Sequence, residues 1–196
     1  MGRATFMLAW VLAAFEVASA QDWTEYQSAQ DAFSANFPGE PKISETSWKS
    51  ENGYDLPARV YDTERGKERY TVTVVDYTAI EQQGIERAKR CPTAAETCIG
   101  NDRGHGPGYW KHDMNGAVIY ATGRFLKRTV TVTELSRAEK GPMFHGHELH
   151  FISNSDQSQT FVFIGMLNMK LYIVEGTVPK DYPPPALFLN SLEVVR

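Results

Sequence analysis

Three things are scarce in this chain: cysteine, positive charge and long apolar runs. Only two of its 196 residues are cysteines, and 20 lysines and arginines face 24 aspartates and glutamates, giving a net charge of −4. A nucleic-acid-binding protein would carry a basic patch or stripe, so this mild acidity argues against a nucleic-acid partner. Beyond residue 20 no stretch reaches the roughly 20 apolar residues that a membrane-spanning helix needs. We therefore expect no membrane span in residues 21–196.

Catalytic signatures are also missing. The chain has no Gly-x-Ser-x-Gly motif of the kind that presents a nucleophilic serine. Its glycine-rich stretch, residues 99–108, neither follows a predicted strand nor opens a predicted helix, which excludes a phosphate-binding loop. No cofactor is expected, and the pattern favours a binding module over an enzyme. The absence of repeats and low-complexity segments indicates one domain over residues 21–196.

The first twenty residues have the layout of a secretory signal peptide. Arg3 supplies a positive start, residues 4–14 are apolar, and Ala18-Ser19-Ala20 forms a small-residue cleavage site. The alternative is a retained membrane helix, for which the apolar run is short. No cysteine follows the cleavage site, so a lipoprotein anchor is not supported. The sequence predicts export, to the periplasm or the medium.

Cys91 and Cys98 are separated by six residues. In an oxidising compartment such a pair is typical of a local disulfide, which would contribute roughly 2–3 kcal/mol by the chain-entropy model. A redox dithiol has two residues between its cysteines, and a metal-binding pair has two to four. The spacing therefore favours a structural disulfide between Cys91 and Cys98.

The strongest structural signal is an apolar pair of runs in residues 159–179. Phe161–Met166 and Leu171–Val174 are rich in β-branched and aromatic residues and flank a turn-like segment, residues 167–170. A lone two-stranded ribbon is marginal in water, so other elements must cover it. We predict a hairpin at the centre of a sheet.

The remaining patterns predict further strands and a few helices. Alternation or β-rich composition indicates strands over residues 33–37, 42–48, 57–62, 69–77, 117–122, 129–135 and 144–153. Thr78 and Glu81 form a capping-box pattern that predicts a helix to about residue 90. Trp23 and Tyr26 suggest a first turn or short helix, and residues 186–191 a short helix. The fold class is α+β, with an antiparallel sheet of about seven or eight strands flanked by helices.

Several motifs carry a resemblance to known proteins. The segment FSANFPGEP at residues 33–41, with Trp23 and Tyr26 before it, resembles the opening of a group of exported, mostly uncharacterised bacterial proteins. The segments GHELHFI at 146–152, LYIVEGTVP at 171–179 and ALFLNSLEVV at 186–195 look like other parts of that group. The resemblance covers about half of the mature domain and implies export and a PsbP-like α/β/α sandwich. It carries no catalytic motif.

Two histidines form the best metal candidate. His145 and His147 lie two apart on a predicted strand, so they project to the same face and could share Zn²⁺ or Cu²⁺. A third ligand would be His105 or His112, whereas His150 points to the opposite face with Glu148. The competing interpretation is an exposed polar strand. Two ligands alone are too few to favour a metal site over this interpretation.

A partner-binding candidate follows the glycine-rich stretch. Tyr109, Trp110 and His112, with Lys111 between them, could stack on a sugar or a peptide partner, or could open a strand that packs inward. Two hypotheses of function remain. The first is an exported binding or structural module that contacts an envelope protein or a small ligand. The second is a metal-binding protein or metal-assisted hydrolase using His145 and His147.

Overall fold

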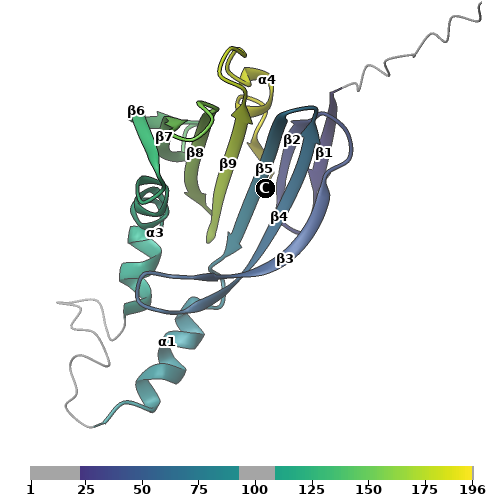
Figure 1. The fold of residues 1–196 in the computed structure, drawn as a ribbon. Coiled ribbons are helices and arrows are strands. Elements are labelled where there is room, and N and C mark those ends of the chain that lie inside the picture. Colours follow the sequence, from purple (N-terminus) through teal and green to yellow (C-terminus); the bar gives the residue numbers. More distant parts are fainter. Residues whose placement is uncertain (1–22, 93–108, 196) are drawn as a thin grey trace, which may run out of the picture.

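The structure, a computed structural model, describes residues 23–92 and 109–195. Its main element is an antiparallel sheet of seven strands in the order β3-β4-β5-β9-β8-β7-β6 (Figure 1). The bounds are β3 Lys42–Lys49, β4 Asp55–Arg65, β5 Glu68–Asp76, β6 Val130–Glu139, β7 His145–Ser153, β8 Gln159–Leu167 and β9 Lys170–Val178. The predicted α+β class with an antiparallel sheet is confirmed.

The predicted central hairpin is also confirmed. Strand β9 is the middle strand of the seven, and β8 pairs with it from Gln159↔Val178 to Leu167↔Lys170. Asn168 and Met169 form its turn with φ angles of 51° and 61°. A two-residue turn with both residues left-handed matches the twist of the flanking strands, which fixes their register.

Two different layers cover the sheet. Helix α3, Tyr109–Leu126, lies over one face, and helix α1, Ile80–Lys89, packs against α3 at one end of the sheet. The other face packs against a small sheet in the order β1-β2-β10 and the one-turn helix α4, Ala186–Leu189. The small sheet comprises β1 Thr24–Ser28, β2 Phe33–Phe37 and β10 Glu193–Val194. The predicted sandwich architecture is therefore confirmed, and its second outer layer combines helix α4 with the small sheet.

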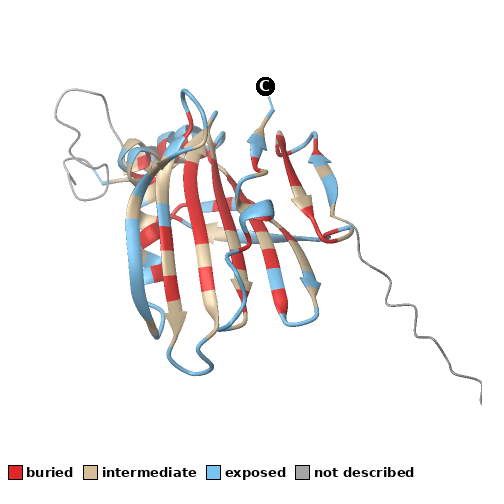
Figure 2. Ribbon diagram, turned by 90° about the horizontal axis from the view of Figure 1, so that it is seen from above, coloured by how far each residue is buried: buried red, intermediate tan, exposed pale blue. Residues whose placement is uncertain are grey.

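Burial follows these layers. The central strands β8 and β9 are mostly buried, whereas the edge strand β6 is mostly exposed (Figure 2). Phe33, Tyr61 and Tyr172 are at most 1% exposed on the small-sheet side. Val75, Ile164 and Leu171 are fully buried on the helix side. The sheet thus separates two apolar cores.

The strand predicted over residues 117–122 is wrong, because these residues belong to α3. Its buried positions, Trp110, Asp113, Ala117, Ala121 and Phe125, recur every three or four residues. That spacing places them on one helix face, and the two alanines let the helix approach the sheet closely. Val118, Ile119 and Tyr120 favoured a strand only by composition.

Two local predictions at element starts are also corrected. Tyr26 lies in strand β1, and Trp23 directly precedes that strand, so the two residues do not form a helical turn. Helix α1 begins after Ala79 without a side-chain cap, because Thr78 bonds backward to Asp76 at 2.8 Å from its amide and 2.6 Å from its hydroxyl. Thr78 is therefore part of a turn and not a cap.

Candidate binding groove

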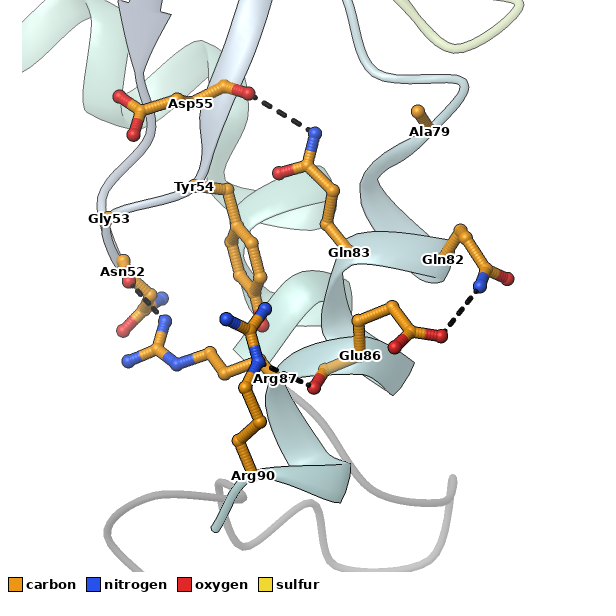
Figure 3. Close-up of a pocket in the computed structure, with 10 residues that line it drawn as sticks. All are labelled: Asn52, Gly53, Tyr54, Asp55, Ala79, Gln82, Gln83, Glu86, Arg87 and Arg90. Atoms are coloured by element: carbon orange, nitrogen blue, oxygen red, sulfur yellow. Dashed lines mark hydrogen bonds between the residues drawn. The ribbon is translucent and has the colours of Figure 1, made fainter.

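A polar groove separates helix α1 from the turn between β3 and β4 (Figure 3). It has a volume of about 760 Å³. The turn contributes Asn52, Gly53, Tyr54 and Asp55, and the helix with its flanking residues contributes Ala79, Gln82, Gln83, Glu86, Arg87 and Arg90. It is the candidate functional site, and we call it the α1 groove.

Asp113 of α3 holds the turn that forms one wall of the α1 groove. Its carboxylate is 2% exposed and accepts hydrogen bonds from the Ser50 hydroxyl, from the Asn52 amide at 2.9 Å and from the Asn52 side-chain nitrogen at 2.6 Å. Ser50 in turn accepts a bond from the Tyr54 amide at 2.9 Å. The groove wall is thus set by a residue more than sixty positions further along the chain.

Replacing Asp113 by alanine is expected to loosen this wall. The change leaves the buried Ser50 hydroxyl and two Asn52 donors without their acceptor, at a cost of about 1–3 kcal/mol in the free energy of unfolding. Urea denaturation would measure the loss, and hydrogen exchange at the Asn52 amide should accelerate. Unchanged exchange at Asn52 would contradict the role of Asp113 as the anchor of the turn.

Two arginines line the helix side. The Arg87 guanidinium lies 5.3 Å from the Tyr54 ring centroid and 5.8 Å from that of Tyr109, and its Nη1 donates to the Asn52 carbonyl at 2.7 Å. Arg90 Nε donates to the Glu86 carbonyl at 3.2 Å. Stacking and a single backbone bond fix Arg87 in place while leaving most of its five N–H donors available.

The carboxylates of the α1 groove have other partners. Glu86 contacts Lys89 at 2.8 Å and Asp55 contacts Lys49 at 3.4 Å. The hydrogen bond from Lys89 lowers the pKa of Glu86, so this carboxylate stays ionised and engaged. The charge of nearby Arg90 also lowers the pKa of Glu86. Within residues 23–92 and 109–195, however, no carboxylate makes an ion-pair contact with Arg87 or Arg90. The groove therefore presents two guanidinium groups to a ligand.

The burial of Tyr54 determines the protonation state of its phenol in the α1 groove. Desolvation raises the pKa of its phenol, and the nearby Arg87 opposes that shift without cancelling it. The phenol thus remains protonated at neutral pH. It provides a rigid apolar surface under the Arg87 guanidinium and not an ionised base.

The predicted aromatic patch is divided by the structure. Trp110 is 9% exposed and packs in the helix-side core, whereas Tyr109 is half-buried beneath Arg87. His112 is exposed on the outward side of α3 beside a separate hollow. Only Tyr109 contributes to the α1 groove, as support for Arg87. The groove arginines were missed because two basic residues three apart on a helix are usually a solvated face.

The three histidines of β7 each contact a different partner. His145 Nδ1 lies 3.3 Å from a Glu139 carboxylate oxygen, and His147 Nδ1 lies 2.9 Å from the Thr122 hydroxyl. His150 stacks on Phe161 with ring centroids 4.1 Å apart. Among the residues that the structure describes, no group of three or more His, Cys, Asp or Glu side chains could hold a metal. The metal hypothesis therefore has no third ligand there.

Some predictions lie outside the described residues. The signal peptide at residues 1–20, Cys98 and His105 belong to this group, so export and the Cys91–Cys98 disulfide stay predictions. In the described part of the chain, no helix is both long enough and apolar enough to cross a membrane.

Comparisons with known proteins support the fold alone. No protein-family model matches the chain, and no curated protein matches it. The solution structure of cyanobacterial PsbP (CyanoP) from Synechocystis sp. PCC 6803 is similar, with a TM-score of 0.48 and 10% sequence identity. The match covers 93% of this chain and 98% of that chain. At this score the likeness is one of general arrangement, and the function proposed below takes nothing from it.

Proposed function

We propose that the protein is an exported, non-catalytic binding module whose α1 groove binds an acidic segment of a partner protein. One observation carries the proposal: Arg87 and Arg90 face an open groove without carboxylate partners in the described residues, while Glu86 and Asp55 are paired with lysines. A guanidinium without a carboxylate partner is a donor for an incoming carboxylate.

The lining of the groove supports binding over catalysis. Its described side chains are amides, guanidiniums, carboxylates and one phenol, with no histidine or cysteine beside a nucleophile. Because the groove is open, a flexible partner segment can lie along it. The chain as a whole carries a net charge of −4, so an acidic partner meets repulsion over most of the surface. Recognition would then depend on the two arginines.

This proposal predicts arginine-dependent, salt-sensitive binding. A fluorescein-labelled peptide of glutamates should bind the purified protein, and raising the NaCl concentration should weaken the complex. Arg90→Gln should raise the Kd about fivefold, as expected for an exposed ion pair worth about 1 kcal/mol. Fluorescence anisotropy is the measurement. Arg87→Gln should have a similar or larger effect.

Arg137 provides the matched control. It is an exposed arginine on β6, the strand at the opposite edge of the sheet from β3. Arg137→Gln makes the same change of charge and should leave the Kd unchanged. Equal weakening by Arg137→Gln and Arg90→Gln would indicate attraction to charge in general and would overturn the proposal.

A further inference from the structure

The helix-side face of the large sheet changes from apolar to polar along its central strands. Side chains that share this face form rows across the β5–β9 pair, in the order Val75↔Leu171, Thr73↔Ile173, Thr71↔Glu175 and Arg69↔Thr177. Val75 and Leu171 are fully buried in the core under α3. Of the residues in the rows beyond them, Ile173 is buried, Arg69 is exposed and the other four are partly buried. An antiparallel sheet carries polar residues where its face is open to solvent, so this part of the face is accessible to a ligand.

Two hollows occupy this polar part of the face. One has a volume of about 200 Å³ and lies between Trp48, Arg124 and Ile173. The other has a volume of about 380 Å³ and lies over Thr71 and Thr177. Both are lined by Arg128 and Glu175, so the two hollows adjoin at this ion pair, and we call them together the sheet groove.

Aromatic rings hold the arginines at the helix end of the sheet groove. The Arg124 guanidinium lies 4.1 Å from the Trp48 ring centroid, and that of Arg128 lies 4.1 Å from the Phe125 centroid. Arg128 also donates to both oxygens of Glu175, at 2.7 Å and 3.3 Å. Arg124 has no carboxylate partner within the described residues. Its charge is therefore available to a ligand in the smaller hollow.

The rest of the sheet groove offers both donors and acceptors. Arg69 and Thr71 both donate to the Asp62 carboxylate, at 2.7 Å and 2.8 Å, and the hydroxyl of Thr177 lies 3.0 Å from that of Thr160. Hydroxyl groups of a ligand can donate to carboxylates and accept from guanidiniums. The larger hollow falls within the usual size range of small-molecule sites.

We propose that the sheet groove is a second binding site, distinct from the α1 groove, which takes a small sugar acid. The sugar hydroxyls would bond to the threonines and to the Arg128–Glu175 pair. The single carboxylate of the ligand would bond to Arg124, and the apolar face of the sugar ring would contact Ile173. A sugar acid would form hydrogen bonds with the polar lining through its hydroxyls. Its carboxylate would form an ion pair with Arg124, which has no carboxylate partner among the described residues.

Isothermal titration calorimetry with D-glucuronate tests this site. D-glucuronate should bind, while D-glucose, which lacks the carboxylate, and acetate, which lacks the hydroxyls, should each bind at least about tenfold more weakly. Arg124→Gln should raise the Kd for D-glucuronate about tenfold or more. Thr73→Val, which removes one groove hydroxyl and keeps the side-chain shape, should raise it by a smaller factor. Circular dichroism would verify that both variants are folded.

The variants of the α1 groove separate the two proposals. Arg90→Gln should leave D-glucuronate binding unchanged, and Arg124→Gln should leave binding of the glutamate peptide unchanged. Absence of binding at millimolar D-glucuronate, equal affinity for acetate, or an unchanged Kd in folded Arg124→Gln would each overturn the sheet-groove proposal.

Discussion

Replacing Asp31 by alanine is expected to lower the free energy of unfolding by about 3–5 kcal/mol. Asp31 is 3% exposed, and both of its carboxylate oxygens lie 2.8 Å from Arg59 Nη1. It also accepts from the Tyr61 hydroxyl at 2.6 Å and from Lys170 Nζ at 3.2 Å. These contacts join the β1–β2 turn to β4 and β9, and hence the small sheet to the large one.

The expected cost arises from what alanine leaves behind. The side chains of Arg59 and Lys170 are only 16% and 15% exposed. Without Asp31, Lys170 loses its ion-pair partner, and Arg59 keeps only the exposed Glu45, 3.6 Å from its Nε. Removing one partner of a buried pair costs more than the pair contributes, because the remaining charge stays desolvated.

Urea denaturation measures this loss directly. The melting temperature should also fall by about 6–20 °C, since each kcal/mol shifts a domain of this size by roughly 2–4 °C. Asp181→Ala is the control, because Asp181 is an exposed aspartate beyond β9. It should change the free energy of unfolding by less than about 0.5 kcal/mol. If Asp31→Ala cost no more than Asp181→Ala, the buried network would have no role in joining the sheets.

Local patterns were enough to predict most of the strands of the large sheet. The alternation of Phe33, Ala35 and Phe37 identified β2, and the side chains of these three residues are fully buried. The apolar runs around residues 167–170 identified the central hairpin, and Gly53, with φ of 84°, marks the β3–β4 turn. These features depend on neighbours in the sequence, because side-chain alternation and turn conformation are set within a few residues.

Helix α3 shows where local patterns fail. Val118, Ile119 and Tyr120 have the composition of a strand, but tertiary packing decides the outcome. Gly84 of α1 leaves room for the Trp110 side chain, and any larger residue there would displace that ring. This contact joins segments that no sequence window spans. The helical spacing of Trp110, Ala117 and Phe125 was the one local signal available for the helix.

Both grooves depend on long-range contacts in the same way. The turn of the α1 groove is held by Asp113, and the sheet groove combines Trp48, Arg124 and Glu175 from three separate elements. Only one signal for the sheet groove was present in the sequence. Glu175 interrupts the apolar run of β9, at a position where a central strand would otherwise continue into the core.

Alkaline pH is expected to unfold the protein through its buried tyrosines. Tyr61, Tyr70, Tyr77 and Tyr172 are each at most 1% exposed. Desolvation by burial, reinforced by the hydrogen bond to the Asp31 carboxylate, raises the pKa of Tyr61 from 10.0 to about 12. Burial likewise raises the pKa of the other three above the ordinary value of 10.0. In the folded state all four phenols therefore stay protonated at a pH where those of the unfolded chain ionise.

The direction of the effect follows from proton binding. Above about pH 10 the unfolded state binds fewer protons than the folded state, so the free energy of unfolding falls as pH rises. The stabilisation is complete below pH 10 and is lost as pH approaches the folded pKa of about 12. Little is lost below pH 10, where the unfolded phenols are still protonated. Between pH 10 and 11 each tyrosine loses about 1.4 kcal/mol, so four lose about 5 kcal/mol by pH 11. Since domains are stable by about 5–15 kcal/mol, unfolding should begin near pH 11.

Tyrosinate absorbance and circular dichroism, followed together against pH, measure this transition. The four buried tyrosines should ionise only as the circular dichroism signal is lost. Tyr77→Phe removes one ionisable group whose oxygen has no hydrogen bond in the described residues. It should reduce the loss between pH 9 and 11 by about 1.4 kcal/mol. Ionisation of all tyrosines near pH 10 with a native spectrum would instead mean that the four phenols are open to solvent.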